Sequence, residues 1–442
     1  MSPQLKYPLE KDLEKNRFLM IIEGASARTI FNLTSGAYLV GLLKFMGASD
    51  TFCGYVLAMP VLAAIIQVLS PIILESLESR KRIIMVGSMI HRFLLVTLIA
   101  TPFLPVRPNT RLIIAAIIFL ISNFAVSFVN PAISNMYISF VPQNIRGRFF
   151  GGRESTMLIV ATLVTLIMGT VLDIQKDSGN EIKGYVIVYS FIFLFTILNF
   201  FSYFFMKEVP LIHTSTKIKF SEIFTLPFKN KMFIRYFIML IIWNFAAQIA
   251  SAYFSVYLKS DLDMSYTVIT ILSFINAVSY ALMARVWGKF ADKRGWAKTT
   301  MITVGILCVC HFSWFLTFEN SALMIPLLVF NHISGGIAWS GINVSLFNLQ
   351  FDFTPDEKRT VYIGFSAAFS GFLGYIAAII GAQLVGIMGD KKVILLSLSY
   401  DIKQILFLIS SFLLLICALY IYIFLRSTKK EIGGIKHVKN LI

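Results

Sequence analysis

Long apolar stretches, separated by short polar connections, occupy almost the whole chain. A helix that crosses a bilayer needs about 20 consecutive, predominantly apolar residues. Twelve stretches meet this requirement, at residues 18–43, 50–73, 83–104, 111–140, 149–173, 184–206, 232–258, 264–287, 300–318, 321–350, 361–388 and 402–426. The pattern therefore predicts an all-α membrane protein with twelve transmembrane helices.

Two polar loops show that the pattern is repeated. The loop after the fourth stretch matches the loop after the tenth, 213 positions later, at Phe140/Phe353, Pro142/Pro355, Arg146/Arg359 and Gly151/Gly364. Because each loop joins two apolar stretches, the repeated unit is a set of membrane helices. Duplicated sets of this kind are typical of transporters.

One long polar segment, residues 207–231, divides the twelve stretches into six and six. It contains two prolines and five lysines, which indicates a linker between two helical bundles, part of it an amphipathic surface helix. The predicted organisation is a bundle over 1–206, a cytoplasmic linker over 207–231, a second bundle over 232–426 and a basic tail over 427–442.

The distribution of Lys and Arg predicts the orientation. If both termini and the even-numbered loops share one side, 28 of the 39 basic residues lie in or beside the loops of that side, against nine on the other. Basic residues favour the cytoplasmic side. We therefore expect a multi-pass protein of the cytoplasmic membrane with both termini in the cytoplasm, and a tail that lies along anionic headgroups.

Composition restricts the classes of molecule that this chain is expected to bind. Hydrophobic residues make up 57% of the chain and charged residues 14%. The net charge of +16 would suit nucleic acid, but the charges lie in short connections rather than on one face, so no nucleic-acid partner is expected. The four cysteines lie within apolar stretches, and we expect no metal and no cofactor. No nucleophile motif or phosphate-binding loop indicates an enzyme, and we expect a monomer.

The loop after the eighth stretch carries a more specific motif. It reads Gly288-Lys-Phe-Ala-Asp292-Lys-Arg294-Gly295-Trp-Ala-Lys298. This resembles the signature of the major facilitator superfamily, with a Gly, an Asp, basic residues, a second Gly and a closing basic residue. The resemblance implies two six-helix bundles that alternate access, and a charged cytoplasmic latch that is shut in the outward-facing state. In that latch, Asp292 would pair with a basic residue such as Arg359.

The corresponding loop of the first half is degenerate. The 213-residue offset places residues 75–82 on 288–295, where charges are kept but the glycines and the aspartate are absent. We expect Glu78 with Arg146 or Arg148 as the substitute pair. The alternative is that these charges are solvated and follow only the bias toward basic cytoplasmic loops.

Polar groups inside the first six predicted helices are candidates for solute binding, because such groups are costly in a bilayer. Arg28 and Asn32 share one face of the first helix with Ser35, and this face is expected to line the cavity. Asn123 of the fourth helix is a further candidate for the substrate. Its alternative role is a hydrogen bond between helices.

Three ionisable residues suggest coupling or charge neutralisation. Glu23 is the only acid well inside a predicted span of the first half, and it either carries a coupling proton or neutralises a buried arginine. Arg92 can bind an anionic group or pair with Glu23. Its neighbour His91 is a second coupling candidate or a structural hydrogen-bond donor.

The second half is richer in amides and aromatic rings. The substrate candidates on the seventh, eighth and tenth helices are Asn244, Gln248, Asn276, Tyr280, Trp339 and Asn343. Asn276 and Tyr280, like Trp339 and Asn343, place an amide one helical turn from an aromatic ring. This combination suits a neutral polyhydroxylated ligand, although each residue can also serve helix packing.

Together these patterns favour a secondary transporter of a small polar solute. A sugar or a glycoside is the favoured solute, and transport can be coupled to protons or another cation. An efflux antiporter for lipophilic compounds is the main alternative, because Phe and Met are abundant. The embedded arginines are also consistent with a carrier of organic anions. A receptor that binds a solute without moving it would also fit the fold.

Overall fold

The computed structural model describes residues 10–68, 80–142, 145–208, 220–354, 359–389, 391–395 and 397–425. Within these ranges, eleven helices are long and apolar enough to cross a membrane, and one apolar helix, Gly36–Phe45, is shorter. The predicted all-α class is confirmed. The only strands in the described ranges form a short hairpin between the last two spanning helices.

The described residues cluster into two compact units. Unit 1 combines 1–216 with 255–271, and unit 2 combines 217–254 with 272–442. The stretch 255–271, which lies in the second half of the sequence, is thus held by contacts with the first half. The predicted boundaries of the bundles at 206 and 232 stay predictions.

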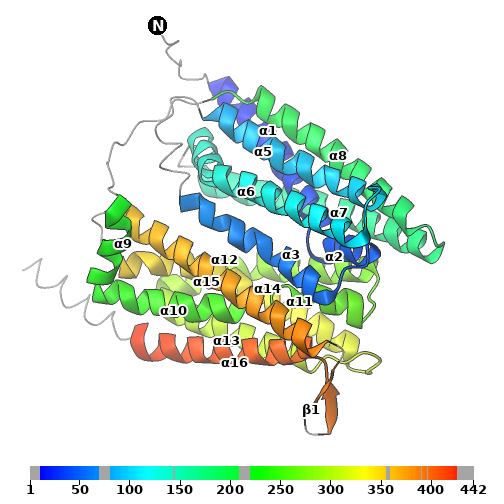
Figure 1. Ribbon diagram of the computed structural model, residues 1–442. Helices are drawn as coiled ribbons and strands as arrows, with labels where there is room; N and C mark the ends of the chain where they lie inside the picture. Colours follow the sequence, from blue (N-terminus) through cyan, green and yellow to red (C-terminus); the bar gives the residue numbers. More distant parts are fainter. Residues whose placement is uncertain are drawn as a thin grey trace, which may run out of the picture. The chain divides into compact units, whose positions relative to one another are not determined.

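Unit 1 contains most helices of the first half. They are α1 (Glu10–Leu33), α2 (Gly36–Phe45), α3 (Asp50–Ala63), η1 (Ala64–Val68), α5 (Lys81–Thr97), η2 (Leu98–Phe103), α6 (Pro108–Phe140), α7 (Arg146–Asp177) and α8 (Glu181–Phe205). Figure 1 shows α1, α5 and α8 side by side, and α1 also packs against α7. Met20, Phe140 and Tyr203 form the buried centre of one apolar core of this unit.

The first spanning stretch is broken into α1 and α2. The hydroxyl groups of Thr34 and Ser35 donate back to the carbonyl oxygens of Ile30 (2.7 Å) and Phe31 (2.6 Å). Gly36 then takes a φ of +51°, a conformation that glycine adopts at little cost. The sequence predicts one continuous span here, because the residues on both sides of the break are apolar.

Unit 2 contains most of the second half. Its elements are α9 (Phe220–Lys229), α10 (Lys231–Gln248), most of α12 (Tyr266–Arg294), α13 (Trp296–Phe315), α14 (Met324–Phe353), α15 (Arg359–Met388), β1 (Val393–Leu395), β2 (Leu398–Tyr400), α16 (Ile402–Tyr420) and η4 (Ile421–Leu425). Helix α13 packs against α14 and α16, and α10 packs against α15 and α16.

The seventh spanning stretch is also interrupted. Helix α10 ends at Gln248, and α11 (Tyr253–Val256) and the π-helical turn η3 (Tyr257–Asp261) follow after a gap. The ends of α1 and α10 are 215 residues apart (248 minus 33), close to the 213-residue offset of the repeat. The duplication is therefore visible as two equivalent helix breaks.

Helix α9 lies inside the predicted linker. It packs on α15, where the hydroxyl group of Tyr362 donates to the carbonyl oxygen of Leu226 (3.4 Å). The rings of Phe228 and Phe365 meet edge to face at 5.4 Å. This part of the linker is thus a helix attached to unit 2.

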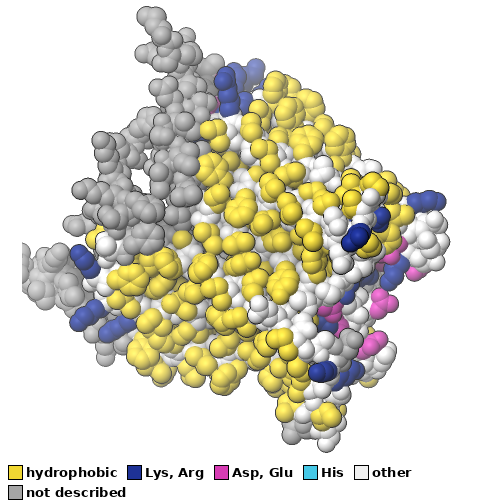
Figure 2. All heavy atoms as spheres, in the orientation of Figure 1, with side chains coloured by type: hydrophobic (Ala, Val, Ile, Leu, Met, Phe, Trp, Pro, Cys, Tyr) yellow, Lys and Arg dark blue, Asp and Glu magenta, His cyan; other side chains and the backbone are white. Residues whose placement is uncertain are grey.

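The surface is divided by polarity. Hydrophobic side chains cover most of the visible face, and Lys, Arg, Asp and Glu gather at the ends of the helices (Figure 2). Many of the exposed side chains are large and apolar, such as Ile117 on α6 and Leu282 on α12. A surface of this kind suits contact with lipid rather than water.

Candidate functional site

A buried carboxylate lies at the centre of unit 1. Glu23 of α1 accepts hydrogen bonds from Arg92 Nη2 (3.1 Å) and Arg153 Nη2 (3.2 Å). The Tyr137 hydroxyl donates to Glu23 Oε2, and the Tyr203 hydroxyl donates to Oε1 at 3.1 Å. Glu23 is only 4% exposed, and these contacts supply the charged and polar partners that a buried carboxylate requires.

Five helices meet at this one side chain. Arg92 comes from α5, Tyr137 from α6, Arg153 from α7 and Tyr203 from α8, and we call this set with Glu23 the Glu23 cluster. Asn199 of α8 adds a hydrogen bond from Nδ2 to the backbone carbonyl oxygen of Glu23 (3.1 Å). The cluster therefore ties together most of the helices of the unit.

The sequence indicated Glu23 and Arg92 but gave no role to Arg153, Tyr137 or Tyr203. Arg153 lies close to the start of a predicted span, where an arginine is expected to face headgroups. In the structure its Nε donates to the carbonyl oxygen of Met20 (3.0 Å). Gly24 makes room for the guanidinium group, since a Cβ at this position would overlap it. A glycine beside an embedded acid was the available signal.

The charges of the Glu23 cluster do not balance. Two guanidinium groups face one carboxylate, and within the described part of the chain Arg92 Nε is buried without a hydrogen-bond partner. The cluster therefore carries an excess of one positive charge inside the unit.

The other candidates of the first half lie apart from Glu23. Arg28 is exposed and Asn32 is half-buried, on the side of α1 that faces away from the cluster. His91 Nδ1 lies 2.7 Å from Ser122 Oγ, and this contact joins α5 to α6. Asn123 donates to the carbonyl oxygen of Phe119 within its own helix (2.8 Å). The structure thus places the pair Glu23 and Arg92 on one side of α1, and Arg28 and Asn32 on the other.

In unit 2, aromatic rings and an amide from three helices come together. Trp339 of α14 meets Trp243 of α10 edge to face at 5.6 Å between ring centroids. One turn further along α14, Asn343 Nδ2 donates to the hydroxyl group of Tyr280 on α12 (3.3 Å). Trp339 is 37% exposed and Asn343 is also exposed. We call these four residues the aromatic–amide site.

Close packing of α12 and α14 holds this site in place. A Cβ at Gly336 would overlap the backbone oxygen of Asn276, so only a glycine allows the two helices to approach this closely. Asn276 Nδ2 donates to the carbonyl oxygen of His332 (2.9 Å), and Trp287 Nε1 donates to that of Ile337 (2.9 Å). Tyr280 and Asn343 are therefore carried by a rigid pair of helices.

The remaining candidates of unit 2 have other roles in this structure. The amide group of Asn276 forms a hydrogen bond between α12 and α14. Asn244 donates to the carbonyl oxygen of Leu240 in its own helix (2.9 Å). Gln248 is half-buried at the last position of α10. Of the six predicted substrate residues, three, Tyr280, Trp339 and Asn343, lie in the aromatic–amide site.

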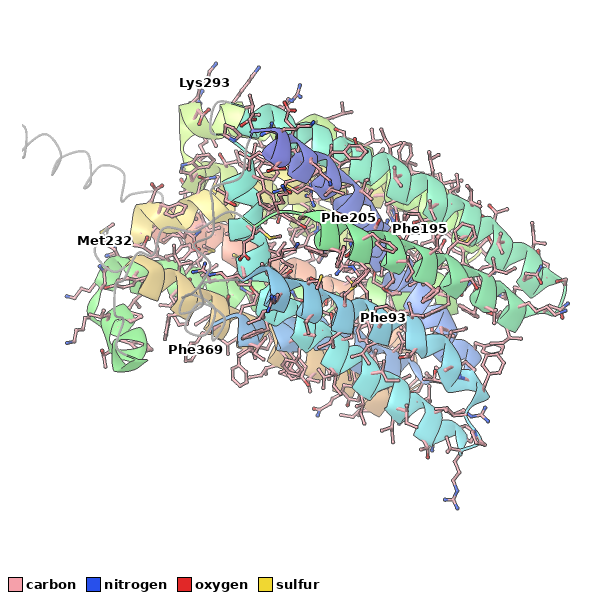
Figure 3. All side chains as sticks on the ribbon, turned by 90° about the horizontal axis from the view of Figure 1, so that it is seen from above. Phe93, Phe195, Phe205, Met232, Lys293 and Phe369 are labelled. Atoms are coloured by element: carbon pink, nitrogen blue, oxygen red, sulfur yellow. The ribbon has the colours of Figure 1, made fainter. Side chains whose placement is uncertain are left out.

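The loop with the family signature forms a tight turn between α12 and α13. Gly295 takes a φ of +86°, which explains why the second glycine of the motif is at this position. Asp292, Lys293 and Arg294 are exposed, and Lys293 points away from the helices (Figure 3). A Cβ at Gly288 would meet no atom.

The partners of the predicted latch are outside what the structure describes. Glu78 lies outside the described residues, and only the backbone of Arg146 and Arg359 is described. The pairs Asp292–Arg359 and Glu78–Arg146 stay predictions.

A second group of contacts in unit 1 involves the stretch 255–271. Asp173 at the end of α7 accepts hydrogen bonds from the backbone N–H groups of Tyr266 and Thr267 (both 2.8 Å) and from the Thr267 hydroxyl (2.6 Å). This carboxylate therefore caps the N-terminus of α12, although it belongs to another helix. We call it the Asp173 cap.

The side chain of Tyr266 extends this attachment. Its hydroxyl group lies 2.7 Å from that of Tyr185 on α8, and its ring is 5.2 Å from that of Tyr38 on α2. A Cβ at Gly41 would overlap the Tyr266 hydroxyl. The sequence does not indicate a role for these residues, because tyrosines and a helix-end aspartate resemble ordinary interfacial residues.

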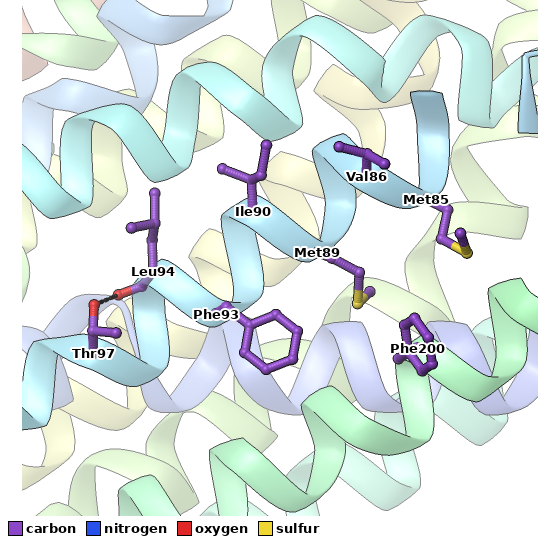
Figure 4. Close-up of a pocket in the computed structure, with 8 residues that line it drawn as sticks. All are labelled: Met85, Val86, Met89, Ile90, Phe93, Leu94, Thr97 and Phe200. Atoms are coloured by element: carbon purple, nitrogen blue, oxygen red, sulfur yellow. Dashed lines mark hydrogen bonds between the residues drawn. The ribbon is translucent and has the colours of Figure 1, made fainter. Parts of the chain in front are cut away.

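A groove of about 490 Å³ on the surface of unit 1 is lined by α5 and α8 (Figure 4). Its walls are almost entirely apolar and include Met85, Met89, Phe93 and Phe200. Ile90 and Phe93 are exposed. The groove suits an acyl chain and offers little to a polar solute.

The twelve apolar segments, the repeat and the convergent polar sites define a polytopic membrane transporter. The family model of the Major Facilitator Superfamily matches residues 22–379, and the chain belongs to this family. It is therefore a transporter of small solutes and not an enzyme. No curated protein matches the chain in a sequence comparison.

Solved structures agree with the fold. The nucleoside transporter NupG is 16% identical, with a TM-score of 0.67 over 93% of this chain and 98% of that one. The xylose transporter XylE from E. coli, in an inward-open conformation, is 13% identical, with a TM-score of 0.63 over 94% and 95%. A POT family transporter in complex with 5-aminolevulinic acid is also 13% identical, with a TM-score of 0.64 over 94% and 96%. At these identities the likeness concerns the fold.

Proposed function

We propose that this protein is a secondary transporter that moves a small polar solute containing a sugar ring. The observation that carries the proposal is the aromatic–amide site, in which one turn of α14 presents Trp339 and Asn343 beside Trp243 and Tyr280. A sugar offers hydroxyl groups to an amide and apolar C–H faces to aromatic rings. The similarity to transporters described for a nucleoside and for xylose supports this class, because both solutes contain a pentose.

The helix breaks support the same assignment. In transporters, solute sites lie near interrupted helices at corresponding positions of two repeats. Here α1 and α10 both end at such a break. Asn32 lies one residue before the end of α1 and Gln248 is the last residue of α10, so we keep both as substrate-binding residues.

The test is ligand-induced thermal stabilisation of the purified protein by pentoses, hexoses, glycosides and nucleosides. We expect one of these classes to raise the unfolding temperature. Asn343→Ala should remove that shift, whereas Asn348→Ala, which alters an amide bonded within the same helix, should preserve it. Stabilisation by lipophilic cations alone would favour an efflux antiporter. Stabilisation by organic anions that is lost in Arg28→Met would favour an anion carrier.

We further propose that the Glu23 cluster couples solute transport to the movement of a cation, and the proton is the favoured cation. Its buried carboxylate can exchange partners between Arg92 and Arg153. Flux into proteoliposomes with and without a proton gradient tests this, and Glu23→Gln, compared at equal amounts of folded protein, should remove the dependence on the gradient. Glu154→Gln, which changes an exposed acid on α7, should retain it. Equal wild-type flux with and without the gradient would contradict proton coupling. Solute binding without flux would indicate a receptor.

We propose the cytoplasmic membrane as the location, with both termini in the cytoplasm, and a monomer as the working state. The bias of Lys and Arg toward one side of the spans supports this orientation. Protease accessibility of a C-terminal tag in sealed right-side-out vesicles tests it. A tag that is cleaved before the vesicles are opened would reverse the assignment.

A further inference from the structure

The hairpin between α15 and α16 has an apolar face that is only partly covered by protein. Val393 pairs with Tyr400, and Leu395 pairs with Leu398. Because side chains alternate between the two sides of a strand, these four residues share one face. Ile394 and Ser399, which also pair, lie on the other face.

The inner half of this face is packed on unit 2. The ring of Tyr400 stacks on Phe315 of α13 with 4.4 Å between centroids and contacts Phe318 at 5.1 Å. Tyr400 is only 3% exposed. Asp401 then caps α16 with a capping box. The base of the hairpin is thus fixed firmly to the bundle.

The outer half of the same face extends past the edge of the bundle. Leu395 is 41% exposed and Leu398 is 51% exposed. In Figure 1 the hairpin runs across the axis of α16 rather than continuing along it. The hairpin therefore leaves the bundle sideways, near the ends of α15 and α16 that it connects.

The attachments of the hairpin set its depth. The spans on either side end at Met388 and begin at Ile402, so the hairpin starts at the membrane surface. Each strand has three residues and a length of about 10 Å, while the headgroup layer on each side is roughly 5–8 Å thick. A hairpin of this length that runs sideways stays within reach of that layer.

The charges at its base suit this position. Lys391 and Lys392 precede β1 and are both exposed. A lysine at the membrane surface places its ammonium group among phosphates while its stem lies on apolar material. A surface with leucines on one face and lysines at the base matches the chemistry of a phospholipid surface.

We propose that strands β1 and β2 form a lipid-binding element, which inserts Leu395 and Leu398 into the bilayer interface on the side opposite the termini. It anchors the loop between α15 and α16 to the membrane and thereby fixes the outer end of both helices. The proposal depends on the spanning helices of the fold and not on the identity of the solute.

Site-directed spin labelling in phosphatidylcholine vesicles with a fraction of phosphatidylglycerol tests the proposal. Leu395→Cys and Leu398→Cys place a nitroxide on the proposed lipid face, and Ser399→Cys is the matched control on the opposite face. The protein without an added cysteine, labelled in parallel, gives the background from Cys308. The measurement is the ratio of collision rates with lipid-soluble oxygen and with water-soluble nickel chelate.

We expect this ratio to be several-fold higher at positions 395 and 398 than at position 399. Equal ratios at the three positions would overturn the proposal, because the two faces of the hairpin would then have the same surroundings. Spin–spin broadening at 395 and 398 would overturn it as well, since a second copy of the chain would then cover the face. The exposed positions keep the variants folded, which the unfolding temperature checks.

Discussion

At the scale of single residues, the Glu23 cluster shows how one buried acid organises a helical bundle. Its carboxylate is bound by two guanidinium groups and two phenol groups from four other helices. Removing its charge leaves two buried cations unpaired, and breaking a buried pair in this way costs about 3–5 kcal/mol. The number of buried charges left without a partner therefore determines which substitutions in the cluster reduce stability.

We predict that Glu23→Gln is strongly destabilising and that Arg153→Met partly restores stability in the double variant. Glu23→Gln alone leaves two positive charges, whereas the double variant leaves one. The coupling between the two sites should be about 2–3 kcal/mol, the upper part of the range for residues in one network. Unfolding of the four proteins in detergent measures it.

Arg28→Met supplies the control for this cycle. It removes a guanidinium group from the exposed side of the same helix, so it should not restore the stability of Glu23→Gln. Equal rescue by Arg28→Met and Arg153→Met would show that net charge, rather than the contact with Glu23, governs the effect.

The sequence allowed only part of this cluster to be predicted. Glu23 and Arg92 are ionisable residues in the middle of apolar stretches, and such residues stand out. Arg153 lies near the end of its stretch, where an arginine normally faces headgroups, and Tyr137 and Tyr203 are common residues in a membrane helix. Which of these side chains point inward depends on the rotation of each helix, and packing between helices determines that rotation.

At the scale of helices, glycines decide which pairs approach closely. We predict that Gly336→Ala destabilises the protein by about 1–3 kcal/mol, because the added methyl group overlaps the backbone of Asn276. It should also weaken solute binding, since α12 and α14 carry Tyr280 and Asn343. Thermal unfolding and the ligand-induced shift measure the two effects.

Gly305→Ala on α13 is the matched control for this substitution. A Cβ at Gly305 would meet no atom within 4 Å, and alanine is favoured over glycine in a helix by up to about 1 kcal/mol. This variant should be as stable as the parent or more stable. A loss of stability equal to that of Gly336→Ala would contradict the close-packing explanation.

The Asp173 cap is a second feature at this scale. We predict that Asp173→Ala costs about 1 kcal/mol, within the range for loss of a helix cap, and accelerates hydrogen exchange at the N–H groups of Tyr266 and Thr267. Asp177→Ala removes an exposed acid four residues along α7 and should leave exchange at those amides unchanged. Protection that survives in Asp173→Ala would mean that other contacts hold the start of α12.

Helix number was readable from the sequence, whereas helix continuity was not. Twelve apolar stretches predict the class of fold because a span requires length and apolarity, which are properties of the sequence alone. The breaks after α1 and α10 both occur inside apolar sequence. At the end of α1 the hydroxyl groups of Thr34 and Ser35 bond back to the helix, and after α10 the Ser251 hydroxyl donates to the carbonyl oxygen of Gln248. The hairpin of β1 and β2 was missed for a similar reason, since its strands have only three residues each.

At the scale of the whole molecule, the contacts of residues 255–271 with unit 1 join the two halves of the sequence. Alternating access requires one half to move against the other, so we expect these contacts to separate in the course of transport. Thr170 of α7 and Thr267 of α12 lie within this region, with 3.3 Å between their hydroxyl oxygens. Cysteines at these two positions would carry their sulfur atoms near the places of the hydroxyl oxygens, so the pair is a suitable choice for a cross-linking test.

We therefore predict that Thr170→Cys/Thr267→Cys forms a disulfide under mild oxidation and loses solute flux in proteoliposomes, and that a reducing agent restores the flux. The reason is that a bridge at this point holds the start of α12 against α7 throughout the cycle. Each single cysteine variant, oxidised in the same way, should keep its flux. Full transport by the bridged protein would mean that residues 255–271 move together with unit 1, and that the motion between the halves occurs elsewhere along the chain.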